Sequence, residues 1–120
     1  MPMCHVLIIE DEPLVAAMIR DLLEDEGATS FDFAETQEEA VAAAGAHPPA
    51  LITSDVGLRE GTGPLAVAAI QARLGPVPVM FITATPEDCA PCSPAALVIA
   101  KPFTSAAIAR AFHDLAPPAA

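Results

Sequence analysis

Four short apolar runs in this chain each end in a polar side chain that is suited to phosphate chemistry. The runs are residues 6–9 before Glu10 and Asp11, 51–54 before Asp55, 79–82 before Thr83, and 96–100 before Lys101. Continuous apolar runs of this length are typical of parallel strands buried on both faces. If the four strands lie in one parallel sheet, their carboxyl ends open at the same edge, where open α/β sheets place their sites. The pattern therefore predicts one crevice that holds three carboxylates, a hydroxyl and an ammonium group.

Stretches with helical features separate the runs. Their expected bounds are 13–26, 36–45, 64–74 and 104–116. Gly27 follows the first stretch as a helix stop, and Thr36 with Glu39 makes a capping box at the start of the second. A fifth and weaker strand is expected over residues 30–34. The order predicts an α/β fold with a parallel sheet covered by helices on both faces, in a single domain over residues 1–120.

The segment between the last two runs departs from this alternation. Residues 84–95 contain Pro86, Pro91 and Pro94. Proline disfavours helix at the residue before it and lacks a backbone N–H donor. At most one helical turn fits around residues 87–90, so we expect a loop where the neighbouring connections have whole helices.

Composition excludes several classes of function. Five Lys and Arg residues against sixteen Asp and Glu residues give a formal net charge of −11, which repels the phosphate backbone of nucleic acids. No apolar run approaches the roughly 18 residues of a membrane span, and the first residues lack the features of a signal peptide. We therefore expect a cytoplasmic protein that binds neither nucleic acid nor membranes directly, and whose partners present basic or apolar surfaces.

The acids at the predicted sheet edge favour a hard divalent cation. Glu10 and Asp11 would meet Asp55 there, and carboxylates so close repel one another unless a cation such as Mg²⁺ lies between them. Asp55 can also attack phosphorus and form an aspartyl phosphate, while Thr83 can donate a hydrogen bond to a phosphoryl oxygen and Lys101 supplies positive charge. Taken singly, these residues are better explained as helix caps, turn residues or solvated side chains. Phosphoryl transfer is favoured because all of these residues follow predicted strands and so fall at the same edge of one sheet.

Together these motifs resemble the receiver domains of response regulators in two-component signalling. The matching segments are residues 6–14 for the first-strand motif, 51–55 for the phosphoacceptor strand, Gly63 eight residues later, Thr83-Ala84 for the switch hydroxyl and Lys101-Pro102-Phe103 for the lysine motif. Glu10 stands where the family more commonly has aspartate, and the resemblance covers about residues 4–116. It implies a doubly wound, flavodoxin-like (βα)5 fold with strand order 2-1-3-4-5, in which the fourth helix is shortened or lost.

The resemblance also implies how the site works. Asp55 would accept a phosphoryl group from a histidine kinase or a histidine phosphotransfer protein, with Thr83 and Lys101 in contact with that group. The implied Mg²⁺ ligands are Glu10, Asp11, Asp55 and the backbone carbonyl of Gly57. The peptide bond between Lys101 and Pro102 is expected to be cis, as it commonly is in similar domains. Phosphorylation would shift an equilibrium between two surface arrangements and so change the binding of a downstream protein target.

One position departs from the family pattern. In receivers the residue three before the lysine is typically aromatic, and its ring moves as the switch hydroxyl moves; here this residue is Val98. Together with the proline-rich segment, Val98 predicts that the signal leaves the site by a rebuilt route. Residues 81–87 and 97–103 are similar to stand-alone receivers of the alphaproteobacterial stress-signalling type, and we expect a protein of that kind.

Two other functions remain open. A degenerate receiver would bind partners without phosphorylation. An aspartyl-phosphate phosphatase of the haloacid-dehalogenase type is disfavoured because it should carry D-x-D after its first strand, whereas Pro13 stands two places after Asp11. We therefore expect no enzymatic activity beyond self-phosphorylation and self-dephosphorylation at Asp55.

Cys89 and Cys92 form a C-x-x-C motif that has three interpretations. A redox pair should open a helix after an early strand, and a zinc site would need two further ligands, which are only available far away in the sequence. Two ordinary residues in a loop are therefore the favoured interpretation.

Overall fold

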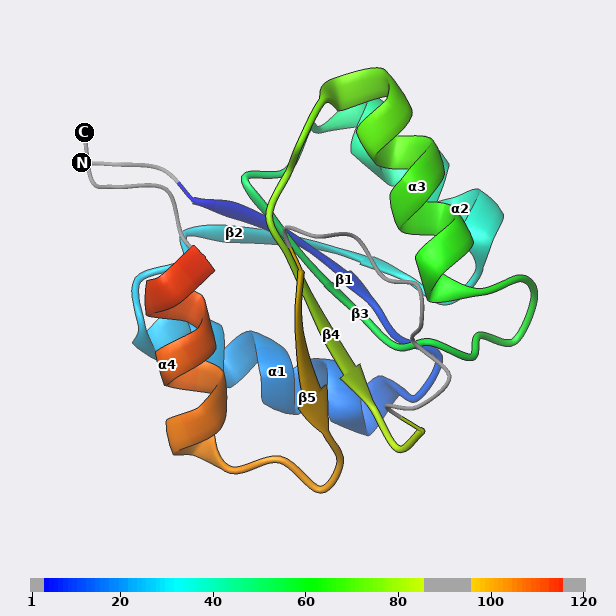
Figure 1. The fold of residues 1–120 in the computed structure, drawn as a ribbon. Coiled ribbons are helices and arrows are strands. Elements are labelled where there is room, and N and C mark those ends of the chain that lie inside the picture. Colours follow the sequence, from blue (N-terminus) through cyan, green and yellow to red (C-terminus); the bar gives the residue numbers. More distant parts are fainter. Residues whose placement is uncertain (1–3, 86–95, 116–120) are drawn as a thin grey trace.

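Five parallel strands form one sheet, and their spatial order is β2-β1-β3-β4-β5 (Figure 1). The computed structural model describes residues 4–85 and 96–115. The strands are β1 (His5–Ile9), β2 (Ser30–Ala34), β3 (Leu51–Ser54), β4 (Val79–Thr83) and β5 (Ala96–Ala100). The expected fold class, a doubly wound parallel sheet in the order 2-1-3-4-5, is therefore confirmed.

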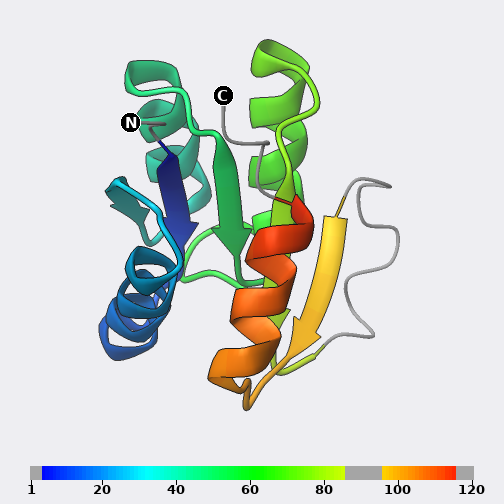
Figure 2. The same ribbon diagram turned by 90° about the vertical axis from the view of Figure 1, so that its left-hand side faces the viewer.

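Helices cover both faces of the sheet, as Figure 2 shows from a second direction. They are α1 (Pro13–Asp25), α2 (Gln37–Ala46), α3 (Gly63–Leu74) and α4 (Ser105–Leu115). The helices α1 and α4 pack on one face, and α2 and α3 pack on the other. Each begins and ends within one residue of the bounds expected from the sequence. None of the helices in the described ranges combines the length and the apolar character that crossing a lipid bilayer requires.

Local signals in the sequence set the ends of these helices. The hydroxyl of Thr36 accepts a hydrogen bond from Glu39 N–H at 3.1 Å, and the Glu39 carboxylate accepts one from Glu35 N–H at 2.8 Å. The first bond satisfies a backbone donor that the first turn of α2 leaves without a partner, and the second ties the residue before the N-cap to that turn. Beyond α1, Gly27 has a φ of +116°, a backbone conformation that a side chain would strain.

Strand residues alternate between two apolar layers. Leu7 and Ile9 of β1 pack toward α2 and α3, whereas Ile8 packs toward α1 and α4. Because both faces of β1, β3 and β4 are covered, β3 and β4 are buried throughout and β1 is buried from its second residue onward. The strand β2 lies at an edge of the sheet and leaves Phe33 exposed, which explains its mixed polar and apolar sequence.

The connection from β4 to β5 lies mostly outside the described residues. Residues 84 and 85 follow β4 without forming a helix, and residues 86–95 are not described. The four helices of the described ranges fit the expectation that the fourth helix of the (βα)5 pattern, between β4 and β5, is shortened or lost. The expected loop, with at most one helical turn around residues 87–90, falls largely outside the described part, as do Cys89 and Cys92.

Candidate functional site

The carboxyl ends of β1 and β3 place Glu10 and Asp55 side by side. Hydrogen bonding of the sheet continues past each strand, because Asp55 N–H donates to the Ile9 carbonyl and Glu10 N–H to the Ala34 carbonyl, both at 2.9 Å. Side chains alternate along a strand, so Glu10 projects to the same face as Ile8, which α1 and α4 cover. The two acids thus extend from neighbouring strands at one sheet edge, as the sequence predicts.

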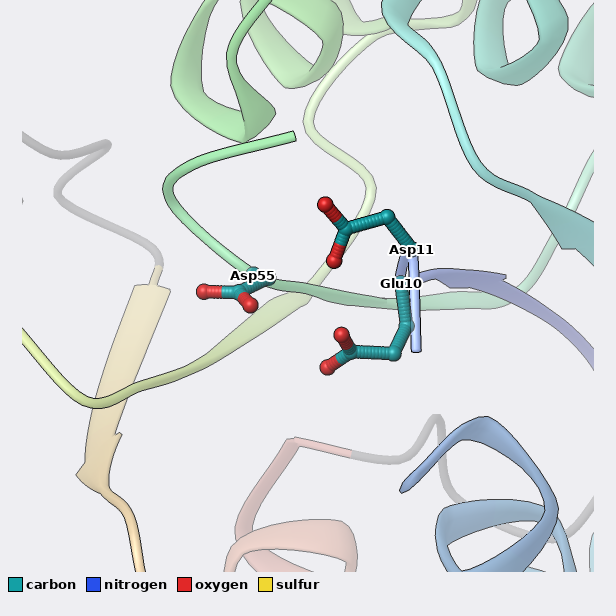
Figure 3. A group of neighbouring side chains, drawn as sticks. All are labelled: Glu10, Asp11 and Asp55. Atoms are coloured by element: carbon teal, nitrogen blue, oxygen red, sulfur yellow. The ribbon is translucent and has the colours of Figure 1, made fainter. Parts of the chain in front are cut away.

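Glu10, Asp11 and Asp55 form a carboxylate cluster at this edge (Figure 3). One oxygen of each residue lies within 4.8 Å of the others. Glu10 is only 3% exposed, whereas Asp11 and Asp55 are half-buried. The N-cap of α1 is Glu12, whose side chain makes no capping hydrogen bond. The explanation of Asp11 as a helix cap is therefore wrong, and its carboxylate belongs to the cluster.

Lys101 joins this cluster from the far edge of the sheet. Its Nζ donates to Glu10 Oε1 and to Asp55 Oδ2, both at 3.0 Å. Because Lys101 directly follows β5, the ammonium reaches across the end of β4 to contact residues that follow β1 and β3. The peptide bond between Lys101 and Pro102 is cis, which confirms that expectation.

Backbone N–H groups hold the second carboxylate oxygen of both Glu10 and Asp55. Asp55 Oδ1 accepts from Val56 N–H at 2.7 Å, and Glu10 Oε2 accepts from Glu12 N–H at 3.2 Å. Sequence reasoning missed both donors, because every residue except proline carries the same backbone N–H and residue type gives no signal. With both oxygens bonded, each carboxylate is held in one orientation.

Burial decides the charge state of Glu10. Loss of solvation raises the pKa of Glu10 from 4.5 to about 7; the hydrogen bond from Lys101 opposes this rise and the charge of Asp55 adds to it. Burial lowers the pKa of the Lys101 ammonium, but its bonds to the two carboxylates outweigh that effect, so the pKa of Lys101 is raised. Three carboxyl groups thus share one ammonium, and an added divalent cation would relieve the repulsion among them.

Thr83 lies at the end of β4 with its hydroxyl bonded within its own loop. Thr83 Oγ1 accepts from Thr85 N–H at 3.0 Å and lies 3.3 Å from Thr85 Oγ1. Its carbonyl accepts from Lys101 N–H at 2.8 Å. Within residues 4–85 and 96–115 the hydroxyl makes no hydrogen bond to Asp55. The structure therefore brings Lys101 to the carboxylate cluster and leaves the Thr83 hydroxyl outside it.

Gly63 packs directly against the backbone of Asp55. A Cβ at this position would overlap the carbonyl oxygen of Asp55 and the hydroxyl of Ser54, so only glycine fits. The Ser54 hydroxyl also donates to the Asp55 carbonyl, at 2.8 Å. Gly57, the expected backbone ligand of Mg²⁺, is exposed in the intervening turn, where it pairs with Thr62. The turn after β3 is thus fixed by the packing of Gly63 against Asp55 and by the bridge between Gly57 and Thr62.

Comparison with known families settles what kind of domain carries this cluster. The profile of the response regulator receiver domain matches residues 6–113. The chain belongs to the response regulator receiver family. The receiver is 39% identical over 105 residues to the phyllosphere-induced regulator PhyR of Methylorubrum extorquens, an alignment that covers 85% of this chain and 39% of PhyR. It thus spans about two fifths of the length of that relative.

Solved structures of receivers share the fold. The receiver domain of Erythrobacter litoralis PhyR superposes with a TM-score of 0.83 at 31% identity, covering 99% of this chain and 97% of that chain. The receiver domain of the Pseudomonas aeruginosa sensor histidine kinase PA1611, which holds a magnesium ion in its active-site cleft, superposes with a TM-score of 0.81 at 24% identity. That alignment covers 93% of this chain and 96% of the PA1611 domain, and it concerns the fold alone.

The carboxylate cluster has the donor set of a magnesium site. All three side chains offer carboxylate oxygens, which Mg²⁺ prefers over nitrogen or sulfur. The residues present therefore fit a hard divalent cation.

Proposed function

We propose that this receiver accepts a phosphoryl group on Asp55 and signals by a change in protein binding. The observation that carries the proposal is how the Asp55 carboxylate is held. One oxygen accepts from Val56 N–H at 2.7 Å and the other from Lys101 Nζ at 3.0 Å. A carboxylate in a fixed orientation can attack phosphorus, and the nearby ammonium can balance the charge that develops on the phosphoryl oxygens.

The phosphoryl donor in this proposal is a phosphohistidine on a histidine kinase or a histidine phosphotransfer protein. An oxygen of Asp55 forms a bond to phosphorus as the bond from phosphorus to the donor imidazole nitrogen breaks. The imidazole leaves with that electron pair and takes up a proton. Lys101 Nζ then gives up its hydrogen bond to Asp55 Oδ2 and donates to a phosphoryl oxygen. The Thr83 hydroxyl gives up its hydrogen bond with Thr85 and donates to another phosphoryl oxygen.

We propose that Glu10, Asp11, Asp55 and the Gly57 carbonyl hold Mg²⁺ during this reaction. The bound ion would neutralise charge on the transferring group. Without a metal, the Lys101 ammonium holds the Glu10 and Asp55 carboxylates close together, since it bonds to both at 3.0 Å. The cluster is therefore already close to the arrangement that a divalent ion needs.

The proposal limits the chemistry to the gain and loss of a phosphoryl group at Asp55, with no turnover of another substrate. The downstream partner would be a protein that distinguishes the phosphorylated surface from the unphosphorylated one. Because Val98 is exposed and not aromatic, the usual coupling through a ring cannot carry the signal from Thr83. A change at Lys101 and β5 is the alternative route.

One experiment tests the proposal directly. The protein is incubated with acetyl phosphate and Mg²⁺ and its intact mass is measured, with Asp55→Asn as the test variant and Asp21→Asn as the control. Asp21 is an exposed acid on α1, so its variant has the same change in charge far from the cluster. We expect a phosphoryl adduct in the parent and in Asp21→Asn, and none in Asp55→Asn or after removal of Mg²⁺ with EDTA.

Other outcomes of this experiment would identify the other functions. Absence of an adduct, together with no response to beryllofluoride, would contradict phosphorylation and favour a receiver that binds partners without it. Rapid release of phosphate from many phosphate esters would instead indicate a phosphatase. An adduct that persists in Asp55→Asn would place the reaction on another residue.

A further inference from the structure

His5, Asp32 and His47 form a second cluster of metal-ligating side chains, away from the phosphorylation site. His5 Nε2 lies 3.0 Å from Asp32 Oδ2, and His47 Nδ1 lies 3.2 Å from the same oxygen. The three residues come from the start of β1, the middle of β2 and the C-cap of α2. Figure 1 shows that the amino end of β1, where His5 lies, is opposite the end that leads to Glu10.

Ser30 orients the ring of His5 toward Asp32. Its Oγ lies 2.7 Å from His5 Nδ1. When Nδ1 carries the proton and donates to Ser30, Nε2 turns a lone pair toward the Asp32 carboxylate. In this tautomer Nε2 and the carboxylate oxygen are both acceptors, and a cation between them would join them; in the other tautomer Nε2–H donates to Asp32 Oδ2 at 3.0 Å. A hydrogen bond to the far ring nitrogen is also the usual support for a histidine that binds a metal.

Two of the three pairs of ligand atoms have a spacing close to that of zinc ligands, whereas the ligand nitrogens of His5 and His47 lie more than 4.8 Å apart, so the His47 ring has to turn to close the third pair. Zinc binds nitrogen and carboxylate oxygen at about 2.0–2.2 Å, so two ligands of a tetrahedral ion lie about 3.3 Å apart. The two nitrogen-to-oxygen distances, 3.0 and 3.2 Å, are near this value. A set of two imidazoles and one carboxylate suits Zn²⁺, whereas Mg²⁺ prefers oxygen ligands alone.

We propose that His5, Asp32 and His47 bind Zn²⁺, with water as the fourth ligand. The side chains of His5 and Asp32 are 20% and 29% exposed and are placed by the sheet, while His47 is 71% exposed. The His47 ring can therefore turn toward His5 and complete the site, and the fourth position faces solvent. The ion would join the end of α2 to β1 and β2.

Binding requires no net loss of protons from the neutral rings. In the metal-free protein each imidazole can donate an N–H to Asp32 Oδ2. With the ion bound, the proton of each ring moves to its other nitrogen. Ser30 Oγ accepts that hydrogen bond from His5, and water accepts it from His47.

The two metal sites are separate. A strand rises about 3.3 Å per residue, so five steps along the chain put roughly 16 Å between the backbones of His5 and Glu10. The remaining histidine, His113, pairs with Glu26 at 2.6 Å and has no second imidazole beside it within the described residues. His113, which contacts one carboxylate and no second imidazole within the described residues, therefore serves as the control for His5 and His47.

Calorimetric titration with ZnCl₂ tests the proposal, with the absorption spectrum of bound Co²⁺ as a second readout. The parent for these titrations carries serine at positions 4, 89 and 92, because thiols bind zinc, and is kept in excess Mg²⁺. We expect one equivalent of Zn²⁺ and a Co²⁺ spectrum typical of tetrahedral coordination. Affinity should fall at least tenfold in H5Q, in D32N and in H47Q, and about tenfold in S30A, which removes the support of His5.

The variant H47Q decides the test. Because His47 is exposed, its replacement should leave the fold intact, so a loss of zinc binding cannot come from unfolding. H113Q should bind zinc as tightly as the parent. The proposal is overturned if the parent gives no heat and no Co²⁺ spectrum, or if H47Q binds as tightly as the parent. It is equally overturned if zinc affinity depends on Glu10 and Asp55 instead, because the ion would then occupy the carboxylate cluster.

Discussion

Replacing Glu10 by glutamine should stabilise the metal-free receiver above neutral pH. Burial raises the pKa of Glu10 from 4.5 to about 7. The folded state therefore holds more protons than the unfolded state between these values, and stability is lost as the pH rises through this window. One pKa unit corresponds to about 1.4 kcal/mol, so the full effect is about 3 kcal/mol above pH 7. Glutamine keeps the size of the side chain and an oxygen that can accept from Lys101, but carries no charge.

Urea denaturation in EDTA measures this effect at pH 5 and pH 8.5. The variant should gain about 3 kcal/mol in free energy of unfolding at the higher pH, or roughly 10 °C in Tm for a domain of this size, and much less at the lower pH. Glu24→Gln, an exposed acid on α1, should change the free energy little at either pH. Saturating Mg²⁺ should remove the advantage of Glu10→Gln, because only the parent keeps all three carboxylates for the ion.

An equal or lower stability of Glu10→Gln at pH 8.5 in EDTA would refute the reasoning. It would mean that the attraction between Glu10 and Lys101 exceeds the cost of burying the carboxylate. An equal gain at both pH values would show that the change acts through packing and not through charge.

Three further substitutions, one of them with a matched comparison variant, test other parts of the site and the fold by urea denaturation. Lys101→Ala should lower the free energy of unfolding at pH 7 by about 3 kcal/mol, because it leaves the buried Glu10 and the half-buried Asp55 without their counter-charge, and Mg²⁺ should restore part of this loss. Gly63→Ala should cost about 3 kcal/mol or more, since its methyl group would overlap the Asp55 carbonyl, whereas Gly45→Ala has open space and should gain up to about 1 kcal/mol. Thr36→Ala should cost about 1 kcal/mol through loss of the cap of α2.

Each of these predictions has a clear contrary result. A fully stable Lys101→Ala protein in EDTA would mean that the carboxylates do not depend on the ammonium. Similar stabilities of the alanine variants at positions 63 and 45 would contradict the close approach of α3 to the backbone of Asp55. Unchanged stability of Thr36→Ala would mean that water replaces the cap without loss.

The position of the site at the carboxyl ends of the strands could be predicted, because strands buried on both faces appear in the sequence as continuous apolar runs. The runs before Glu10, Asp55 and Lys101 are continuous, and each ends at its polar residue, so parallel pairing brings the three together. What the sequence does not contain is how the side chains bond inside the crevice. Thr83 also follows directly after an apolar run. Its hydroxyl nevertheless accepts from Thr85 N–H, because a backbone donor two residues away competes with side chains on other strands.

The charge of Glu10 was equally beyond prediction from sequence. Its pKa depends on how many oxygen atoms lose water and on where Lys101 lies, and both are properties of the folded site. Backbone donors such as Val56 N–H are invisible for the same reason. Sequence periodicity predicts the face on which a side chain lies, whereas hydrogen bonds require distances.

The reach of Lys101 over the end of β4 makes its side chain a mechanical link between the crevice and the outermost strand. The ammonium at one end contacts residues after β1 and β3, while the backbone at the other end continues from β5. A phosphoryl group that draws the ammonium inward would pull on this edge strand and on the loop that leads into α4. Exposed Leu97 and Val98 would move with it, so the outer surface of the sheet could respond without any ring that swings between two positions.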